Sequence, residues 1–185
     1  MIYYPSEDTF ILAEVAEKIV SDIALDVGTG SGYIAFILSK NSRWVLATDI
    51  NIEAIKNVLK IKRERNINNL DLIVCNLFDA IREKKVDLIT FNPPYLPPDN
   101  YKTGLETETV YLNYNGKNLI IEFLEKLKSF MKNNSECYIV LSSLTGIDYK
   151  LLEKLSLKWN EVKNKKLFFE TLFVLKLFLS PNYKY

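Results

Sequence analysis

The sequence predicts an α/β fold in which a mostly parallel sheet is covered by helices on both faces. Short apolar runs rich in β-branched residues alternate along the chain with segments whose apolar residues recur at helical spacing. No internal repeat and no linker rich in Gly, Ser or Pro divides the 185 residues, and an apolar content of 48% is enough for a buried core. We therefore expect one domain spanning residues 1–185.

The expected helices follow from this spacing and from the residues at their ends. The first lies within residues 1–20, where Ser6 can cap the helix, Glu7 and Asp8 complement its dipole, and apolar residues follow at helical spacing. The other helices are expected at Gly32–Ser39, Ile52–Arg65, Lys117–Met131 and Ile147–Leu155.

The expected strands are short apolar segments between these helices. They lie at Ile23–Val27, Trp44–Ile50, Leu70–Asn76, Val86–Phe91, Glu136–Ser142, Trp159–Val162 and Phe169–Leu179. Only the polar residues 163–166 separate the last two strands, and this connection is too short for a parallel crossover. The sequence therefore predicts an antiparallel C-terminal hairpin at one edge of the sheet, with its turn at residues 163–166.

The chain contains no histidine, and this restricts its chemistry. Ser-His-Asp and Cys-His nucleophile pairs, zinc sites of the His-x-x-x-His kind and an imidazole base are all excluded. The charges sum to +1, so the composition shows no broad basic surface for nucleic acid or an anionic membrane. Any chemistry must come from carboxylates, amides, backbone dipoles or a cofactor.

The cysteines and the apolar runs indicate where the protein works. Cys75 and Cys137 show no metal-ligand spacing and no disulfide framework, and we interpret both as reduced core thiols. The longest apolar run, Leu167–Leu179, is too short to span a membrane and contains Glu170 and Lys176. The first residues lead into an acidic stretch, unlike a secretory signal. We expect a cytoplasmic protein without a metal site.

Two segments predict a site for a nucleotide-like cofactor. Residues 26–32 read Asp-Val-Gly-Thr-Gly-Ser-Gly, where Gly28 and Gly30 let the backbone turn sharply and approach a ligand at the start of a helix. Tyr33 follows, so the spacing is not that of a dinucleotide fingerprint. Asp49, at the end of the second strand, can accept both hydroxyl hydrogens of a ribose. The other interpretation of Asp49 is an acidic cap for the helix that follows.

Residues 92–95 read Asn-Pro-Pro-Tyr directly after the strand Val86–Phe91. Consecutive prolines cannot continue a central strand, and they fix the directions of the Asn92 side chain and the Pro93 carbonyl. These groups lie at the edge where open α/β sheets bind ligands. Their two oxygens can accept both N–H hydrogens of a planar amide or amine and orient its lone pair, and Tyr95 offers a flat wall.

These motifs resemble those of the class I S-adenosylmethionine-dependent methyltransferases. The glycine loop is similar to their motif I, and Asn-Pro-Pro-Tyr is similar to motif IV of members that methylate planar nitrogen. Pro-Ser-Glu-Asp-Thr-Phe at 5–10, Thr-Asp-Ile at 48–50 and Phe-Glu-Thr-Leu at 169–172 extend the likeness to nearly the whole chain. The chain resembles the HemK-type protein-(glutamine-N5) methyltransferases, in particular the short archaeal and eukaryotic branch that modifies class I release factors. Bacterial members carry an extra N-terminal helical domain, which this length leads us not to expect.

The resemblance implies a Rossmann-like, seven-stranded class I methyltransferase fold and S-adenosyl-L-methionine as cofactor. It further implies methyl transfer to the side-chain amide of the Gln in the Gly-Gly-Gln motif of a peptide chain release factor, with water taking the released proton. The residues implied at the cofactor are Thr9, Asp26, Gly28, Gly30, Asp49, Ile50, Asn76, Leu77 and Asn92. The residues implied at the substrate amide are Asn92, Pro93, Pro94 and Tyr95.

The chain departs from the family pattern in two places. Family members commonly carry Asp-Leu after the third strand to recognise the adenine amine, and here the pair is Asn76-Leu77. An Asn oxygen can still accept that hydrogen bond, although without charge. The loop 96–117 lacks the Trp and the paired glycines usual in the family, and Lys117 stands where an arginine is common. A loop of this length beside a site favours a substrate cover.

Two other functions fit the same motifs. Asn-Pro-Pro-Tyr also serves enzymes that methylate exocyclic amines, so N6-adenine or RNA base methylation is an alternative, disfavoured by the near-neutral charge and the lack of a target-recognition segment. A catalytically silent methyltransferase-like binding subunit is the third possibility, and the intact motifs argue against it.

The strand Leu70–Cys75 predicts a protein partner. It should lie at a sheet edge, yet it is apolar and lacks the proline or lysine that protects exposed edges. Relatives bind a small zinc-binding activator subunit along this region, so the resemblance implies a heterodimer. The alternative is that a helix of the same chain covers this strand.

Overall fold

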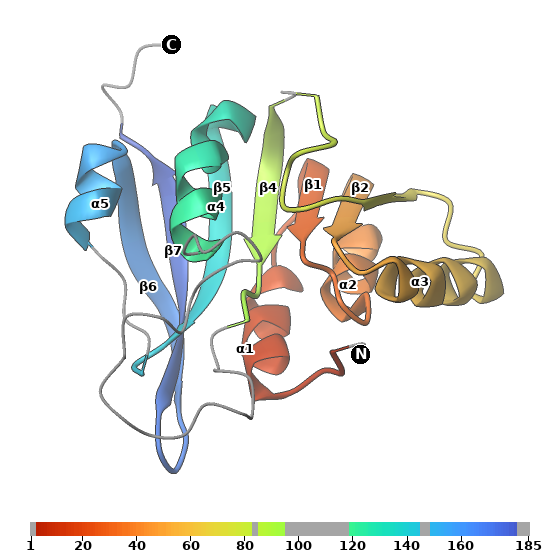
Figure 1. The fold of residues 1–185 in the computed structure, drawn as a ribbon, viewed down its shortest axis with the longest axis horizontal. Coiled ribbons are helices and arrows are strands. Elements are labelled where there is room, and N and C mark those ends of the chain that lie inside the picture. Colours follow the sequence, from red (N-terminus) through yellow and green to blue (C-terminus); the bar gives the residue numbers. More distant parts are fainter. Residues whose placement is uncertain (1–2, 83–84, 95–118, 145–148, 181–185) are drawn as a thin grey trace.

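The structure is a computed structural model that describes residues 3–82, 85–94, 119–144 and 149–180. Seven strands form one sheet in the order β3-β2-β1-β4-β5-β7-β6 (Figure 1). They are β1 (Ser21–Val27), β2 (Ser42–Asp49), β3 (Leu70–Val74), β4 (Val86–Phe91), β5 (Met131–Ser142), β6 (Leu157–Lys166) and β7 (Thr171–Leu179). The predicted α/β fold with a Rossmann-like, seven-stranded sheet is confirmed.

The sheet is parallel except at its C-terminal end. β1 pairs in parallel with β2 and β4, β2 with β3, and β4 with β5. β7 lies between β5 and β6 and is antiparallel to both, which confirms the predicted hairpin. Because β1 to β4 all run in the same direction, the segments that follow them meet at one edge of the sheet.

The predicted turn of the hairpin was wrong. Residues 163–166 are the last part of β6, and the turn lies at residues 167–170, where the Leu167 N–H donates to the Glu170 carbonyl at 2.7 Å. The lysines tolerate a strand because β6 is an edge strand, where Lys163 and Lys165 form ion pairs with acids of the first helix. The turn instead exposes the apolar residues Phe168 and Phe169.

Helices cover both faces of the sheet (Figure 1). The helices are α1 (Glu7–Ala16), α2 (Tyr33–Asn41), α3 (Ile52–Glu64), α4 (Leu119–Leu127), the short 3₁₀ helix η1 (Lys128–Phe130) and α5 (Tyr149–Lys154). One core cluster joins α1, α2 and α3 to one face, and the other joins α4, η1 and α5 to the opposite face. Within the described residues, no helix is long and apolar enough to cross a bilayer.

Several element ends differ from the prediction. The predicted helix Lys117–Met131 gives way to η1 after Leu127, and Met131 is the first residue of β5, because it pairs with Val86 and is fully buried. Residues 117–118, like 147–148 of the last helix, lie outside the described residues. The third strand ends at Val74 rather than Asn76.

The beginning of α1 also differs in detail. Ser6 occupies the N-cap position with extended backbone, but its side chain makes no capping bond. Its carbonyl accepts the Phe10 N–H at 3.0 Å, as in any first helical turn. The predicted capping role of Ser6 is therefore wrong. The helix also ends at Ala16, earlier than residue 20.

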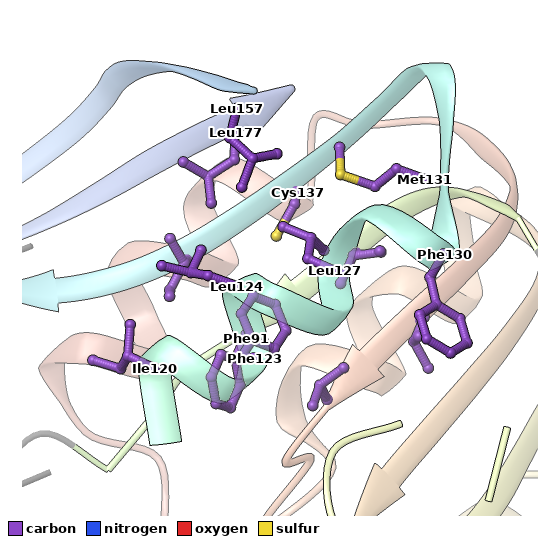
Figure 2. Packing of buried hydrophobic residues seen from close by; sticks show 14 of the residues in the cluster. Phe91, Ile120, Phe123, Leu124, Leu127, Phe130, Met131, Cys137, Leu157 and Leu177 are labelled. Atoms are coloured by element: carbon purple, nitrogen blue, oxygen red, sulfur yellow. The ribbon is translucent and has the colours of Figure 1, made fainter. Parts of the chain in front are cut away.

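An aromatic stack anchors the end of β4. Phe91, its last residue, stacks on Phe123 of α4 with ring centroids 4.3 Å apart, and Phe78 stacks on Phe130 at 4.5 Å. Figure 2 shows this cluster, in which α4 places Ile120, Leu124 and Leu127 over the sheet. Close packing of this kind fixes the chain immediately before Asn92.

Candidate functional site

A cavity of about 830 Å³ opens where the segments after β1, β2, β3 and β4 meet. This is the edge at which open α/β sheets bind ligands. The structure places these predicted site residues around that one cavity: Thr9, Asp26, Gly28, Gly30, Asp49, Ile50, Asn76, Leu77, Asn92, Pro93 and Pro94. Tyr95 and the loop 96–117 lie outside the described residues. The strand order brings together the residues at the ends of β1 to β4, and helix α1 adds Thr9.

The glycine loop between β1 and α2 turns in a conformation that other residues rarely adopt. Gly28, Gly30 and Gly32 have φ values of +66°, +53° and +82°. A hydrogen bond to β2 fixes the loop, because the Thr29 N–H donates to the Thr48 carbonyl at 2.8 Å. A Cβ on Gly32 would lie 2.8 Å from Val58, whereas Gly28 and Gly30 line the cavity.

Asp26 lies at the base of the cavity and holds the loop. Its carboxylate accepts hydrogen bonds from the Thr29 hydroxyl at 2.7 Å and the Thr90 hydroxyl at 2.8 Å. Burial raises the pKa of Asp26 to about 6, although both hydroxyl bonds oppose that shift. A cationic group bound above it would favour the ionised form.

Asp49, at the end of β2, is a loop-binding residue and not the helix cap. Its carboxylate accepts the N–H groups of Gly30 and Asn51, each at 2.8 Å. The cap of α3 is Asn51, whose side chain accepts the Glu53 N–H at 3.0 Å. Each Asp49 oxygen retains further acceptor capacity at the cavity, which suits a ligand with hydroxyl groups.

Asn76 and Leu77 follow β3 in a tight turn, in which Leu77 has a φ of +47°. The Asn76 amide nitrogen lies 3.4 Å from an Asp79 oxygen and 3.5 Å from a Glu122 oxygen. Lys126 joins the same two acids at 2.6 Å and 2.7 Å. With its nitrogen held by carboxylates, Asn76 keeps its side-chain oxygen as an acceptor.

Asn92 is the best-defined polar group of the site. Its Oδ1 atom is buried and, within the described structure, has no hydrogen-bond partner. Its Nδ2 atom donates to Thr9 Oγ1 at 3.4 Å. Pro93 is buried and Pro94 is exposed. A buried, unsatisfied amide oxygen costs free energy unless a ligand donates to it, and such atoms mark binding sites.

The structure adds cavity residues that sequence reasoning missed. These are Tyr3, Asp8, Thr29, Asn51, Cys75 and Asp79, with further apolar wall residues. Asp8 belongs to the motif at residues 5–10, but the sequence analysis interpreted it only as an acidic residue that complements the helix dipole. Cys75 is partly exposed at the cavity, so its interpretation as a core thiol was wrong, whereas Cys137 is a buried free thiol.

Comparisons with known proteins identify relatives of this chain. The family model described as the methyltransferase small domain matches residues 7–169. The chain is 30% identical over 191 residues to Homo sapiens Methyltransferase HEMK2, covering 95% of this chain and 88% of that protein. It is 36% identical over 109 residues to the release factor glutamine methyltransferase of Fusobacterium nucleatum, of which it spans 31%.

A solved structure resembles the whole chain. It is the E. cuniculi Mtq2-Trm112 complex responsible for methylation of the eRF1 translation termination factor. Its TM-score is 0.69 at 25% sequence identity, and the match covers 97% of this chain and 99% of that one.

Proposed function

The chain belongs to the methyltransferase small domain family, and from that premise we propose that it methylates a glutamine side-chain amide of a release factor. The proposed target is the Gln of the Gly-Gly-Gln motif of a class I peptide chain release factor, and the proposed methyl donor is S-adenosyl-L-methionine. The observation that carries this proposal is the buried Asn92 Oδ1 atom, which has no partner in the described structure and belongs to a residue that lines the cavity beside Pro93. Proteins named for glutamine methylation among the relatives support the choice of substrate.

The residues around the cavity fit the cofactor. The left-handed glycines leave room for close approach, and Asp49 has free acceptor capacity where ribose hydroxyls would lie. Asn76 and Leu77 would hold the adenine, and Thr9, Asp26 and the loop would line the methionine end. The bound cofactor supplies an electrophilic methyl group on a sulfonium.

The chain's own residues position the substrate. Asn92 Oδ1 and the Pro93 carbonyl would each accept one N–H of a primary amide, which turns the nitrogen lone pair toward the cavity. The aromatic stack under Phe91 keeps both acceptors in place. A methylated amide nitrogen is strongly acidic, so its proton passes to water and no histidine is needed.

We further propose that a small zinc-binding activator subunit pairs with the edge strand. β3 is at the end of the strand order, and its residue Val74 is 44% exposed. Trp44 of the neighbouring strand β2 is also exposed. Helix α3 packs on one face of β2 and β3 through Val58, yet it does not pair with the strand edge. An open edge flanked by apolar side chains invites strand addition. The Mtq2-Trm112 complex shows that a similar chain assembles with a second protein.

Val74→Lys tests the partner surface. We expect it to prevent co-purification of the co-expressed activator, because a lysine protects an edge strand from pairing. Val20→Lys is the matched control, since Val20 is equally apolar and 83% exposed but lies in the connection between α1 and β1. Retention of the partner by Val74→Lys would refute this surface, and so would an equal loss of the partner in Val20→Lys.

A parallel methylation assay tests the proposed reaction. Purified protein and S-adenosyl-L-methionine are incubated with release factor, with a release factor whose target Gln is replaced by Asn, and with adenine-containing DNA. We expect transfer to the unmodified release factor alone. Transfer to DNA instead would establish base methylation, and failure to bind the cofactor in calorimetry would establish a silent binding subunit.

A further inference from the structure

The Asn92 side chain is the last member of a chain of polar contacts that begins in the N-terminal segment. The Thr9 hydroxyl, which accepts the Asn92 amide, lies 3.2 Å from Asp8 Oδ1. The same carboxylate accepts the Thr9 N–H at 2.5 Å and the Tyr3 hydroxyl at 2.6 Å. Asp8 and Thr9 are both buried, so the contacts between these two residues are shielded from water.

The chemistry of these groups fixes the direction of every bond. A carboxylate has no hydrogen to donate, so the single hydroxyl hydrogen of Thr9 must point to Asp8. Thr9 Oγ1 then offers only lone pairs to Asn92, and only the NH₂ side of that amide can face it. Burial, together with the Asp8 charge, raises the pKa of Tyr3, which therefore remains a donor to Asp8.

We propose that Asp8, acting through Thr9, is a positioning residue that holds the Asn92 amide with Oδ1 toward the substrate. This inference rests on the proposed function and adds the contacts that make the site specific for Gln. If the Asn92 amide were reversed, its NH₂ group would face the NH₂ group of the substrate, and two donors would meet. The same reversed amide would suit a carboxylate, so the contacts select Gln over Glu.

The test measures binding of release factor in two forms, with the target Gln intact and with that Gln replaced by Glu. The enzyme variants are Thr9→Val, which removes the hydroxyl at similar volume, Thr9→Ser, which keeps it, and Asp8→Asn, whose NH₂ group can donate to Thr9. Glu7→Gln is the control, because it removes a charge from the same helical turn while its carboxylate contacts Lys165 and not Thr9.

We expect the wild type, Thr9→Ser and Glu7→Gln to prefer the Gln form by roughly tenfold or more, as a site with matched hydrogen bonds does. In Thr9→Val and Asp8→Asn the preference should fall to within about threefold, and kcat at saturating cofactor should fall roughly tenfold. Calorimetry should show cofactor affinity within about threefold of the wild type in Thr9→Ser and Glu7→Gln, and the Gln preference of every variant is measured at saturating cofactor.

Full retention of the Gln preference in Thr9→Val would overturn the proposal. If the wild type binds neither form, the proposed substrate is wrong, and the orientation is read from hydrogen exchange of the Asn92 side-chain NH₂ by NMR. Slow exchange in the wild type and Thr9→Ser, with fast exchange in Thr9→Val, upholds the contact; equal exchange in all three refutes it.

Discussion

The Thr90 hydroxyl donates a hydrogen bond of 2.8 Å to the Asp26 carboxylate. These residues are also paired by register across β1 and β4, so the contact joins the base of the glycine loop to the strand that carries Asn92. The two halves of the site are therefore held together inside the sheet rather than by surface loops. The cost is a carboxylate that is almost fully buried.

That cost predicts a pH dependence of stability. The pKa of Asp26 rises from 3.8 in the unfolded chain to about 6 in the folded protein, chiefly through burial. The folded state thus binds more protons between these values, and its stability falls as pH rises through this window. The shift in pKa corresponds to a loss of free energy of unfolding on the order of 3 kcal/mol, which is nearly complete once the pH exceeds about 6.

Urea unfolding of the wild type and Asp26→Asn at several pH values isolates this effect, because other titrating groups cancel in the difference. We expect the free energy of unfolding of the wild type, relative to that of Asp26→Asn, to fall by a few kcal/mol between about pH 4 and pH 7. A difference that does not vary with pH would contradict the role assigned to Asp26.

The glycines of the loop should differ in their contribution to stability. Ala at position 32 meets both the left-handed backbone and Val58, with Cβ 2.8 Å from its Cγ2 atom, whereas Ala at position 28 meets Phe91 at an ordinary 3.5 Å. We expect Gly32→Ala to cost about 2–5 kcal/mol and Gly28→Ala about 1–2 kcal/mol. Denaturant titration of both variants measures this, and equal costs would show that the loop relaxes around Gly32.

Asn76→Asp, which restores the residue common in the family, should destabilise this chain. The new carboxylate would lie beside Asp79 and Glu122, which the Asn76 amide nitrogen now faces at 3.4 Å and 3.5 Å. Like charges at such spacing cost about 0.5–1 kcal/mol. Adding Asp79→Asn should recover most of this loss in a double-mutant cycle. Additive effects of the two substitutions would mean that the acids do not interact.

Asn92→Ala should lower kcat while leaving the fold intact. It removes one of the two acceptors proposed for the substrate amide, which costs about 2–4 kcal/mol of transition-state stabilisation, or roughly 30- to 1000-fold in rate. Oδ1 is buried without a partner in the described structure, and the lost Nδ2 contact to Thr9 is long, at 3.4 Å, so the substitution should change the free energy of unfolding little. Single-turnover kinetics and urea titration measure the two effects separately, and an unchanged rate would refute the proposed mechanism.

The sheet was predictable because each strand carries a local signal. The β-branched runs and the glycine and proline punctuation locate β1 to β5 to within a few residues at most ends, and the residues that follow parallel strands necessarily share an edge. The hairpin turn was not predictable from polarity. A lysine-rich segment resembles a turn, yet here residues 163–166 belong to an edge strand whose lysines form ion pairs with α1. Phe168 and Phe169 occupy the exposed turn instead.

The contacts of Tyr3 and Asp8 could not be predicted from the sequence. Ser6, Glu7 and Asp8 all fit the beginning of a helix, and propensity alone cannot distinguish a cap from a residue with tertiary partners. The structure shows that Ser6 makes no capping bond while Asp8 takes the buried contacts that lead to Asn92. Long-range hydrogen bonds depend on packing, which leaves no local pattern.

Methyl transfer to a Gln amide held by Asn92 is the reaction that we propose for this chain. The most direct test is tandem mass spectrometry of release factor incubated with the enzyme and S-adenosyl-L-methionine, with and without the co-purified activator. We predict a mass gain of one methylene on the Gln of the Gly-Gly-Gln peptide, abolished or greatly reduced with Asn92→Ala. An unmodified peptide under both conditions, from enzyme that binds the cofactor, would contradict the claim.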